Sequence, residues 1–181
     1  MSSLSIAFLN NEYRIAQWGS LYGSPHEAGI DILLFIKDLI ETDRIEYFKQ
    51  KLLLCTLLSD EKEISRAAKP TAPQLNVETG SDIFDLVLDS KEPMTLKNSI
   101  ESAADSAYCQ WGYVINFDAE ELEVYRGHNT EELAPDERFY WLEKSTARHS
   151  HFHPLKKIYT ISFNEIKFLQ ITTFLQDIGK A

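Results

Sequence analysis

Residues 109–117 read CQWGYVINF, and this stretch decides the predicted fold. Apolar and aromatic side chains occupy every second position, a period that is typical of a β-strand. They are Cys109, Trp111, Tyr113, Ile115 and Phe117. Asp118-Ala119-Glu120 then predicts a turn. Because residues 122–126 follow as a returning strand, this is the best-defined hairpin of the sequence.

A second hairpin is predicted at the beginning of the chain. Residues 4–9 form an apolar run, and residues 13–18 alternate in character. Between them stands Asn10-Asn11-Glu12, and asparagine tolerates the left-handed backbone of a tight turn. A late strand is expected at residues 157–163.

Helices are predicted from their start signals. Ser24 and Glu27 have capping-box spacing, and Pro25 stands at the first helical position, so a helix is expected over 25–40. Further helices are expected from residues 43, 60, 81, 95 and 135. The pair Ser162 and Glu165 predicts a last helix that ends at Gly179.

These elements predict an α+β fold in a single domain, 1–181. Two hairpins and a late strand would make a mainly antiparallel sheet, packed by several helices. Residues 69–80 contain Pro70 and Pro73 and are expected to form a surface loop.

Composition excludes some classes of function. The 181 residues carry a net charge of −10, which disfavours general nucleic-acid binding and binding to anionic membranes. No apolar run is long enough to span a bilayer, and the first residues lack a signal-peptide pattern. Cys55 and Cys109 have no metal-binding spacing. A cytoplasmic protein without a cofactor is therefore expected.

One candidate ligand site lies at residues 14–27, where a strand leads through two glycines into a helix start. A helix N-terminus suits an anion, and aromatic side chains stack on planar groups. The tripeptide Gln-Trp-Gly, present here, recurs at residue 110. The predicted ligand-binding residues are Arg14, Gln17, Trp18 and Tyr22, with Gln110 and Trp111 opposite. The alternative is an ordinary turn with aromatic packing.

A second, weaker candidate is a metal site at His149, His151 and His153. If extended, this stretch places three imidazoles on one side, and neutral imidazole is a ligand for zinc, copper or nickel. The alternative is a histidine-rich surface loop. Neighbouring side chains on one strand face are about 7 Å apart, which disfavours convergence on one ion.

Three segments resemble an uncharacterised protein family. They are Ala16-Gln17-Trp18-Gly19 with Gly23-Ser24-Pro25, then residues 109–118, then Val124-Tyr125-Arg126-Gly127. The family carries an Ala-Gln-Tyr-Gly-Gln-Trp-Asp-Gly-Tyr-Pro type segment, later a Cys-Glu-Trp-Ala-Tyr-Val-Ile-Asp-Leu-Asp type hairpin, and then Val-Tyr-(Lys/Arg)-Gly. The resemblance implies a shared fold and no known activity. Leu21 and Tyr22 stand where the family has Trp and Asp, so acid-dependent chemistry is not expected at that loop.

Two functions follow from these patterns. A noncatalytic binding or interaction protein is favoured because no complete catalytic set is present, and it predicts an exposed apolar patch. The alternative is a small enzyme or a binder of an anionic, planar, nucleotide-like ligand at residues 14–27. It predicts that both Gln-Trp-Gly segments line one pocket and that Arg14 faces into it.

Overall fold

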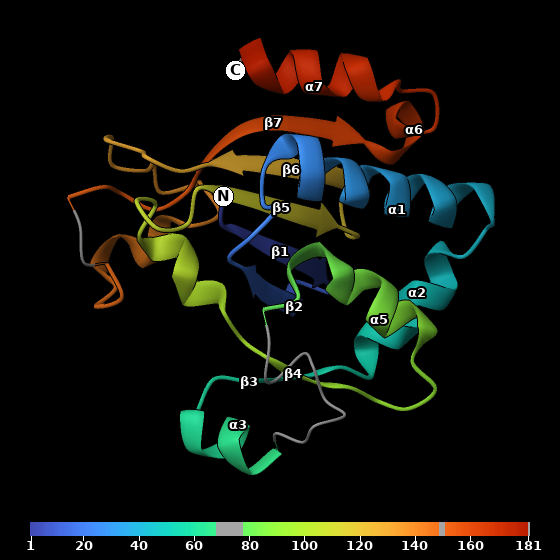
Figure 1. Ribbon diagram of the computed structural model, residues 1–181, viewed down its shortest axis with the longest axis horizontal. Helices are drawn as coiled ribbons and strands as arrows, with labels where there is room; N and C mark the ends of the chain where they lie inside the picture. The colour runs from blue at the N-terminus through green and yellow to red at the C-terminus, as the bar shows by residue number, and fades with distance from the viewer. Residues whose placement is uncertain (68–77, 149–150, 181) are drawn as a thin grey trace.

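A five-stranded mixed sheet forms the centre of the protein in a computed structural model that describes residues 1–67, 78–148 and 151–180 (Figure 1). The strand order is β2-β1-β5-β6-β7. The strands are β1 (Ser3–Leu9), β2 (Glu12–Gly19), β5 (Trp111–Asn116), β6 (Glu121–Arg126) and β7 (Lys156–Ser162). Both predicted hairpins and the late strand are present, and the α+β fold with a mostly antiparallel sheet is confirmed.

A parallel pairing joins the two hairpins. Strand β1 runs alongside β5, from Ser3 opposite Trp111 to Phe8 opposite Asn116. Parallel neighbours need a long crossover, and here the chain between residues 20 and 110 supplies it. This one pairing makes the sheet mixed.

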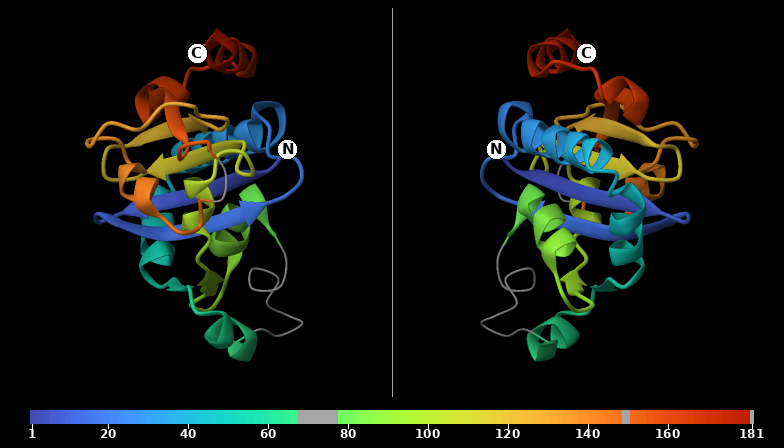
Figure 2. Two further views of the ribbon diagram at one scale, coloured as in Figure 1. Left: turned by 90° about the vertical axis from the view of Figure 1, so that its left-hand side faces the viewer. Right: turned by 90° about the vertical axis from the view of Figure 1, so that its right-hand side faces the viewer.

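Both faces of the sheet are covered (Figure 2). One face packs against the helices α1 (Ile30–Glu41), α2 (Ile45–Leu53), α5 (Ile83–Asp89), α6 (Phe163–Ile166) and α7 (Ile171–Lys180). The opposite face packs against two 3₁₀-helices, η3 (Ile100–Ala104) and η4 (Tyr140–Lys144). Each face therefore has its own core, with Tyr113 and Ile115 in the first and Val114 and Tyr125 in the second.

The helix start at residue 25 differs in detail from the prediction. The first turn, η1 (Pro25–Gly29), is a π-turn that leads directly into α1. The Ser24 hydroxyl donates to the Glu27 carboxylate at 2.8 Å, so it caps no backbone N–H. The capping box does form at the other predicted place, where the Glu165 N–H donates to Ser162 Oγ at 3.3 Å.

One predicted helix is wrong, and another is interrupted. Residues 95–97 form strand β4 (Thr95–Lys97), which pairs in parallel with β3 (Thr56–Leu58) and has Leu96 fully buried, so tertiary contacts override the local helix signal. The last helix is interrupted at residues 167–170, between α6 and α7, and α7 continues through Gly179 to Lys180.

The remaining segments lie around this framework. The β3–β4 pair and α3 (Glu61–Ala67) extend beyond the β2 edge of the sheet (Figure 1). Most of the predicted loop at 69–80 lies outside the described residues, and η2 (Gly80–Asp82) begins at its end. In the described part of the chain, no helix has both the length and the apolar character needed to cross a bilayer.

Candidate functional site

The two Gln-Trp-Gly segments lie on either side of β1, and their tryptophans point to opposite faces of the sheet. Leu4 pairs with Trp18 on one side and with Gly112 on the other, whereas Ser3 pairs with Gly19 and Trp111. Directly opposed residues share a face, and successive residues alternate. Trp18 therefore packs against the core beneath η3 and η4, and Trp111 against the core beneath α1. The two tryptophans do not form two walls of one pocket.

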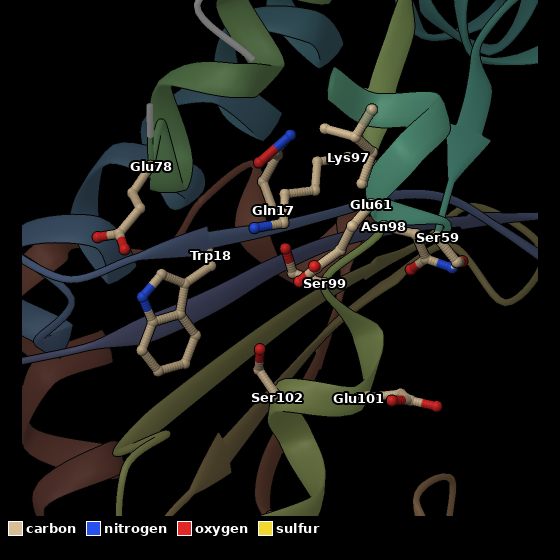
Figure 3. A pocket seen from close by; sticks show the side chains of 11 residues that line it. Gln17, Trp18, Ser59, Glu61, Glu78, Lys97, Asn98, Ser99, Glu101 and Ser102 are labelled. Atoms are coloured by element: carbon tan, nitrogen blue, oxygen red, sulfur yellow. The ribbon is translucent and has the colours of Figure 1, made fainter. Parts of the chain in front are cut away.

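A cavity of about 450 Å³ lies along the outer edge of β2, and we call it the β2-edge cavity (Figure 3). It is lined by Gln17, Trp18, Ser59, Glu61, Ile64, Glu78, Lys97, Asn98, Ser99, Glu101 and Ser102. Gln17 and Trp18 point to opposite sides of β2, and both reach the cavity because it lies along the strand edge. Two of the six predicted ligand-binding residues therefore share a cavity.

Backbone contacts fix the wall of this cavity opposite β2. The Ser99 N–H donates to the Ala16 carbonyl at 2.8 Å, which attaches the end of β4 to the edge strand. The Asn98 side chain donates to Ser59 Oγ at 3.1 Å, and its Oδ1 accepts the Ile100 N–H at 3.1 Å. These bonds hold the polar groups of the wall in place without any ligand.

The charge of the β2-edge cavity is negative. Among the lining residues that the structure describes, three carboxylates, those of Glu61, Glu78 and Glu101, stand against one ammonium group, that of Lys97. Like charges raise the free energy of a bound anion, whereas carboxylates and the face of an indole ring both attract cations. The lining thus favours a cationic group.

Arg14 lies away from this lining. The ladder pairs Ala7 with Ile15 and Phe8 with Tyr13, so Arg14 is the extra residue of a β-bulge. Its guanidinium bonds Glu12 at 2.7 Å, and its Nε is buried without a hydrogen bond among the described residues. Burial raises the pKa of the Cys55 thiol to about 11, and the charge of Arg14 acts in the opposite direction.

The other predicted residues have separate surroundings. Tyr22 is 71% exposed and borders a second hollow of about 360 Å³, beside Asp31 and Asp82. Gln110 Oε1 accepts the Ser2 N–H at 3.3 Å, a contact that holds the start of β1. The Arg126 guanidinium lies 5.9 Å from the Trp111 ring. The structure therefore brings Gln17 and Trp18 together and separates them from Arg14, Tyr22, Gln110 and Trp111.

The histidines do not gather around one point. His149 lies outside the described residues. The ring of His151 stacks on Phe152 at 4.4 Å, while Nδ1 of His153 bonds the Glu143 carboxylate at 2.8 Å. Among the described residues, no three His, Cys, Asp or Glu side chains are arranged to hold a metal ion.

Sequence patterns gave no signal for most of the cavity lining. Ser59 and Asn98 bond to each other although 39 positions separate them, and no local spacing links them. Lys97 and Asn98 fell within a predicted helix, whereas Lys97 ends strand β4 and Asn98 follows it without regular secondary structure. Only Gln17 and Trp18 stood out beforehand, because their tripeptide occurs twice.

No protein-family model matches the chain, and comparisons with curated proteins and with solved structures give no significant match. Function is therefore inferred from the geometry of the chain itself.

Proposed function

We propose that this protein is a noncatalytic binding protein and that a small cationic ligand occupies the β2-edge cavity. The observation that carries the proposal is the lining, in which the Trp18 indole and three glutamates surround one cavity of about 450 Å³. Cavities of roughly 300–1,000 Å³ accommodate small molecules. The ligand class is an organic amine with a ring or short chain that contacts the indole.

The energetics of recognition follow from the groups present. A cation over a tryptophan face gains about 0.5–2 kcal/mol, depending on how far it is desolvated. The carboxylates of Glu61 and Glu101 add an attraction that salt weakens, since both are exposed. Lys97 is exposed as well and opposes a cation, so its removal should tighten binding.

The hydroxyl groups of the cavity support a noncatalytic role. Ser59, Ser99 and Ser102 line it, and a nucleophilic serine needs a base within hydrogen-bond reach. No hydrogen bond between described residues joins these hydroxyls to a basic side chain, and no histidine or cysteine is among the lining residues.

The test is calorimetric titration with phenethylamine and with its anionic counterpart, phenylacetate. We expect phenethylamine alone to bind, with about tenfold weaker affinity in Trp18→Leu and Glu101→Gln, and tighter affinity in Lys97→Gln. Trp141→Leu is the matched control, because Trp141 lies in a different pocket. Equal binding of both compounds, or an unchanged affinity in Trp18→Leu, contradicts the proposal.

A protein partner is a second candidate, supported by a different observation. Leu21 and Tyr22 are adjacent and about equally exposed, at 70% and 71%. Tyr22 also has a φ of 58°, a costly conformation for a residue with a side chain. The nearby hollow carries Asp31, Glu78 and Asp82, which oppose the nucleotide-like anion considered for residues 14–27. A Leu21→Ser/Tyr22→Ser double variant that keeps its elution volume and partners would argue against this candidate.

A further inference from the structure

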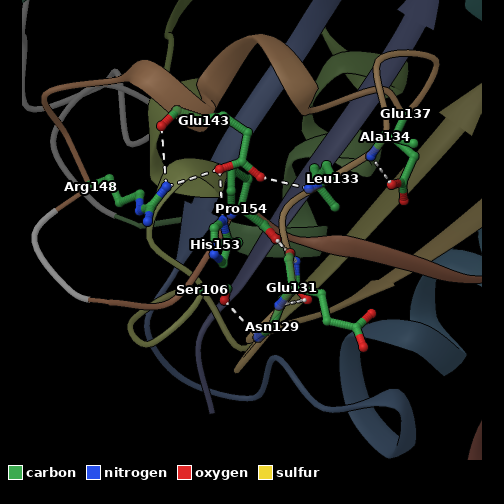
Figure 4. A network of polar contacts seen from close by, with 10 residues as sticks. All are labelled: Ser106, Asn129, Glu131, Leu133, Ala134, Glu137, Glu143, Arg148, His153 and Pro154. Atoms are coloured by element: carbon green, nitrogen blue, oxygen red, sulfur yellow. Dashed lines mark hydrogen bonds and ion pairs between the residues drawn. The ribbon is translucent and has the colours of Figure 1, made fainter.

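A buried glutamate, Glu143, and a histidine, His153, lie in contact on the side of the sheet that η3 and η4 cover. Nδ1 of His153 lies 2.8 Å from Glu143 Oε2, and the same oxygen accepts from Arg148 Nη1 at 2.9 Å (Figure 4). The other oxygen, Oε1, accepts the Leu133 N–H at 2.8 Å. The Glu143 side chain is only 7% exposed, so these donors replace the water that an ionised carboxylate requires.

The contacts determine which nitrogen of His153 is free. A carboxylate accepts hydrogen bonds and donates none, so Nδ1 carries the hydrogen and Nε2 carries the lone pair of the neutral ring. Among the described residues, no hydrogen bond engages Nε2. The backbone is also fixed, because the His153 N–H donates to the Asn129 carbonyl at 2.8 Å and Asn129 Nδ2 donates to the Pro154 carbonyl at 3.0 Å.

His153 borders a cavity of about 280 Å³, which we call the His153 pocket. It is lined by Glu132, Tyr140, Trp141, Glu143, Lys144, Arg148 and His153. Four of these residues belong to η4, and in a 3₁₀-helix the side chains three positions apart lie above one another. Trp141 and Lys144 therefore form one column, and Tyr140 and Glu143 form the next.

Two groups of the His153 pocket remain available to a ligand besides Nε2. The Trp141 side chain is 52% exposed, so much of its ring is open to contact with a planar ligand. Lys144 is exposed and has no ion pair with any described residue, whereas the charge of Arg148 is already compensated by Glu143. Glu132 is the exposed acid of the lining and opposes an anion.

We propose that the His153 pocket binds a planar aromatic anion. The ring stacks on Trp141, the anionic group pairs with Lys144, and a donor on the ligand bonds His153 Nε2. Arg148 and Glu143 keep the imidazole oriented and act as positioning residues. The shared chemistry is a flat ring with one attached anion, which both aromatic carboxylates and nucleoside monophosphates provide. This site is independent of the β2-edge cavity, with which it shares no lining residue.

The test is titration with three probes, 3-hydroxy-2-naphthoate, its neutral amide, and adenosine 5′-monophosphate. We expect at least one of the two anions to bind and the amide to bind about tenfold more weakly, because it lacks the charge that pairs with Lys144. Preference for the nucleotide or for the carboxylate then identifies the source of the ligand, and either supports the proposal.

Some variants are expected to weaken ligand binding and one to strengthen it, which makes the test specific. Lys144→Gln and His153→Gln should each weaken binding about five- to tenfold, whereas Glu132→Gln should strengthen it. Lys97→Gln and His151→Gln are matched controls outside the pocket and should change nothing. All five substituted positions are at least partly exposed, so folding is checked by an unchanged circular dichroism spectrum. Failure of both anions to bind, or equal effects of the pocket variants and their controls, overturns the proposal.

Discussion

Arg138 and Glu123 form a bidentate ion pair in the protein interior. Arg138 Nε donates to Glu123 Oε2 at 2.9 Å and Nη2 donates to Oε1 at 2.5 Å. The Glu123 side chain is 3% exposed. Asn116 Nδ2 donates to Oε1 at 2.8 Å, and the Tyr125 hydroxyl donates to Oε2. Four donors therefore satisfy this carboxylate, which marks the cluster as structural rather than as a site that awaits a ligand.

Removing the cation of this pair should be strongly destabilising. Arg138→Met leaves the Glu123 charge buried, and we expect the free energy of unfolding to fall by about 3–5 kcal/mol. Lys156→Met is the matched control, because the Lys156–Glu131 pair spans 2.6 Å but is exposed, and exposed pairs contribute about 0–1 kcal/mol. Urea denaturation measures both. Equal losses in the two variants would show that burial does not govern the effect.

The same cluster predicts a dependence of stability on pH. Burial raises the pKa of Glu123, but the hydrogen bonds and charge of Arg138, with those of Tyr125 and Asn116, outweigh it and lower the pKa. An acid with a depressed folded-state pKa stabilises fully above its unfolded value, about 4.3 for glutamate, and this contribution is lost as the pH falls through the folded value. The free energy of unfolding should therefore decrease below about pH 4.

Arg138→Met should reverse the effect that ionisation of Glu123 has on the free energy of unfolding. Without the guanidinium, burial dominates and raises the pKa of Glu123, so protonation favours the folded state. The deficit of the variant relative to the wild type should be largest at pH 7 and shrink as the pH is lowered to 4. Denaturation at pH 7, 5 and 4 provides the measurement, and a deficit independent of pH would contradict this account.

A methyl group at Gly127 should disrupt the end of β6. A Cβ there would lie closer than 3.0 Å to backbone atoms of Ser106, Cys109 and Gln110. Backbone cannot move aside as a side chain can, so Gly127→Ala should cost about 3 kcal/mol. Gly179→Ala is the control, because it meets nothing within 4 Å and lies within α7. Gly179→Ala should raise the free energy of unfolding by about 0.5 kcal/mol. Midpoints of thermal unfolding that fall equally in the two variants would contradict this comparison.

Acidic residues on α1 and α5 repel one another, which predicts a stabilising substitution. Partial burial raises the pKa of Asp85, and the charges of Asp89, Asp82, Asp38 and Asp31 raise it further. An acid with a raised folded-state pKa opposes folding when ionised, and this penalty disappears as the pH falls through that pKa. Asp85→Asn should therefore raise the melting temperature at pH 7, by a small amount because Asp85 is exposed and screened.

Salt and a charge-matched control test the origin of this gain. The advantage of Asp85→Asn should shrink in 0.5 M NaCl, where the Debye length is only about 4 Å. Asp136→Asn changes the net charge equally from an exposed position and should leave the melting temperature nearly unchanged. A gain that persists in high salt would point to packing instead of repulsion.

Local patterns predicted much of the fold and little of the candidate site. The alternation at 109–117 and the turns at 10–12 and 118–120 gave both hairpins, because these signals depend only on neighbours in sequence. The short strand at Thr95 was missed because its partner, Thr56, lies 39 positions away. The division between α6 and α7 was missed for a similar reason, since tertiary packing overrode the local helix signals.

The sequence by itself determined the strands of the five-stranded sheet, both hairpins and the α+β class, because side-chain alternation follows from backbone geometry within each segment. Only the tertiary structure decided the register between β1 and β5, which places Trp18 and Trp111 on opposite faces. A shift of one residue would have placed them on the same face. That register buries residues in two cores at once, a condition that no local pattern records.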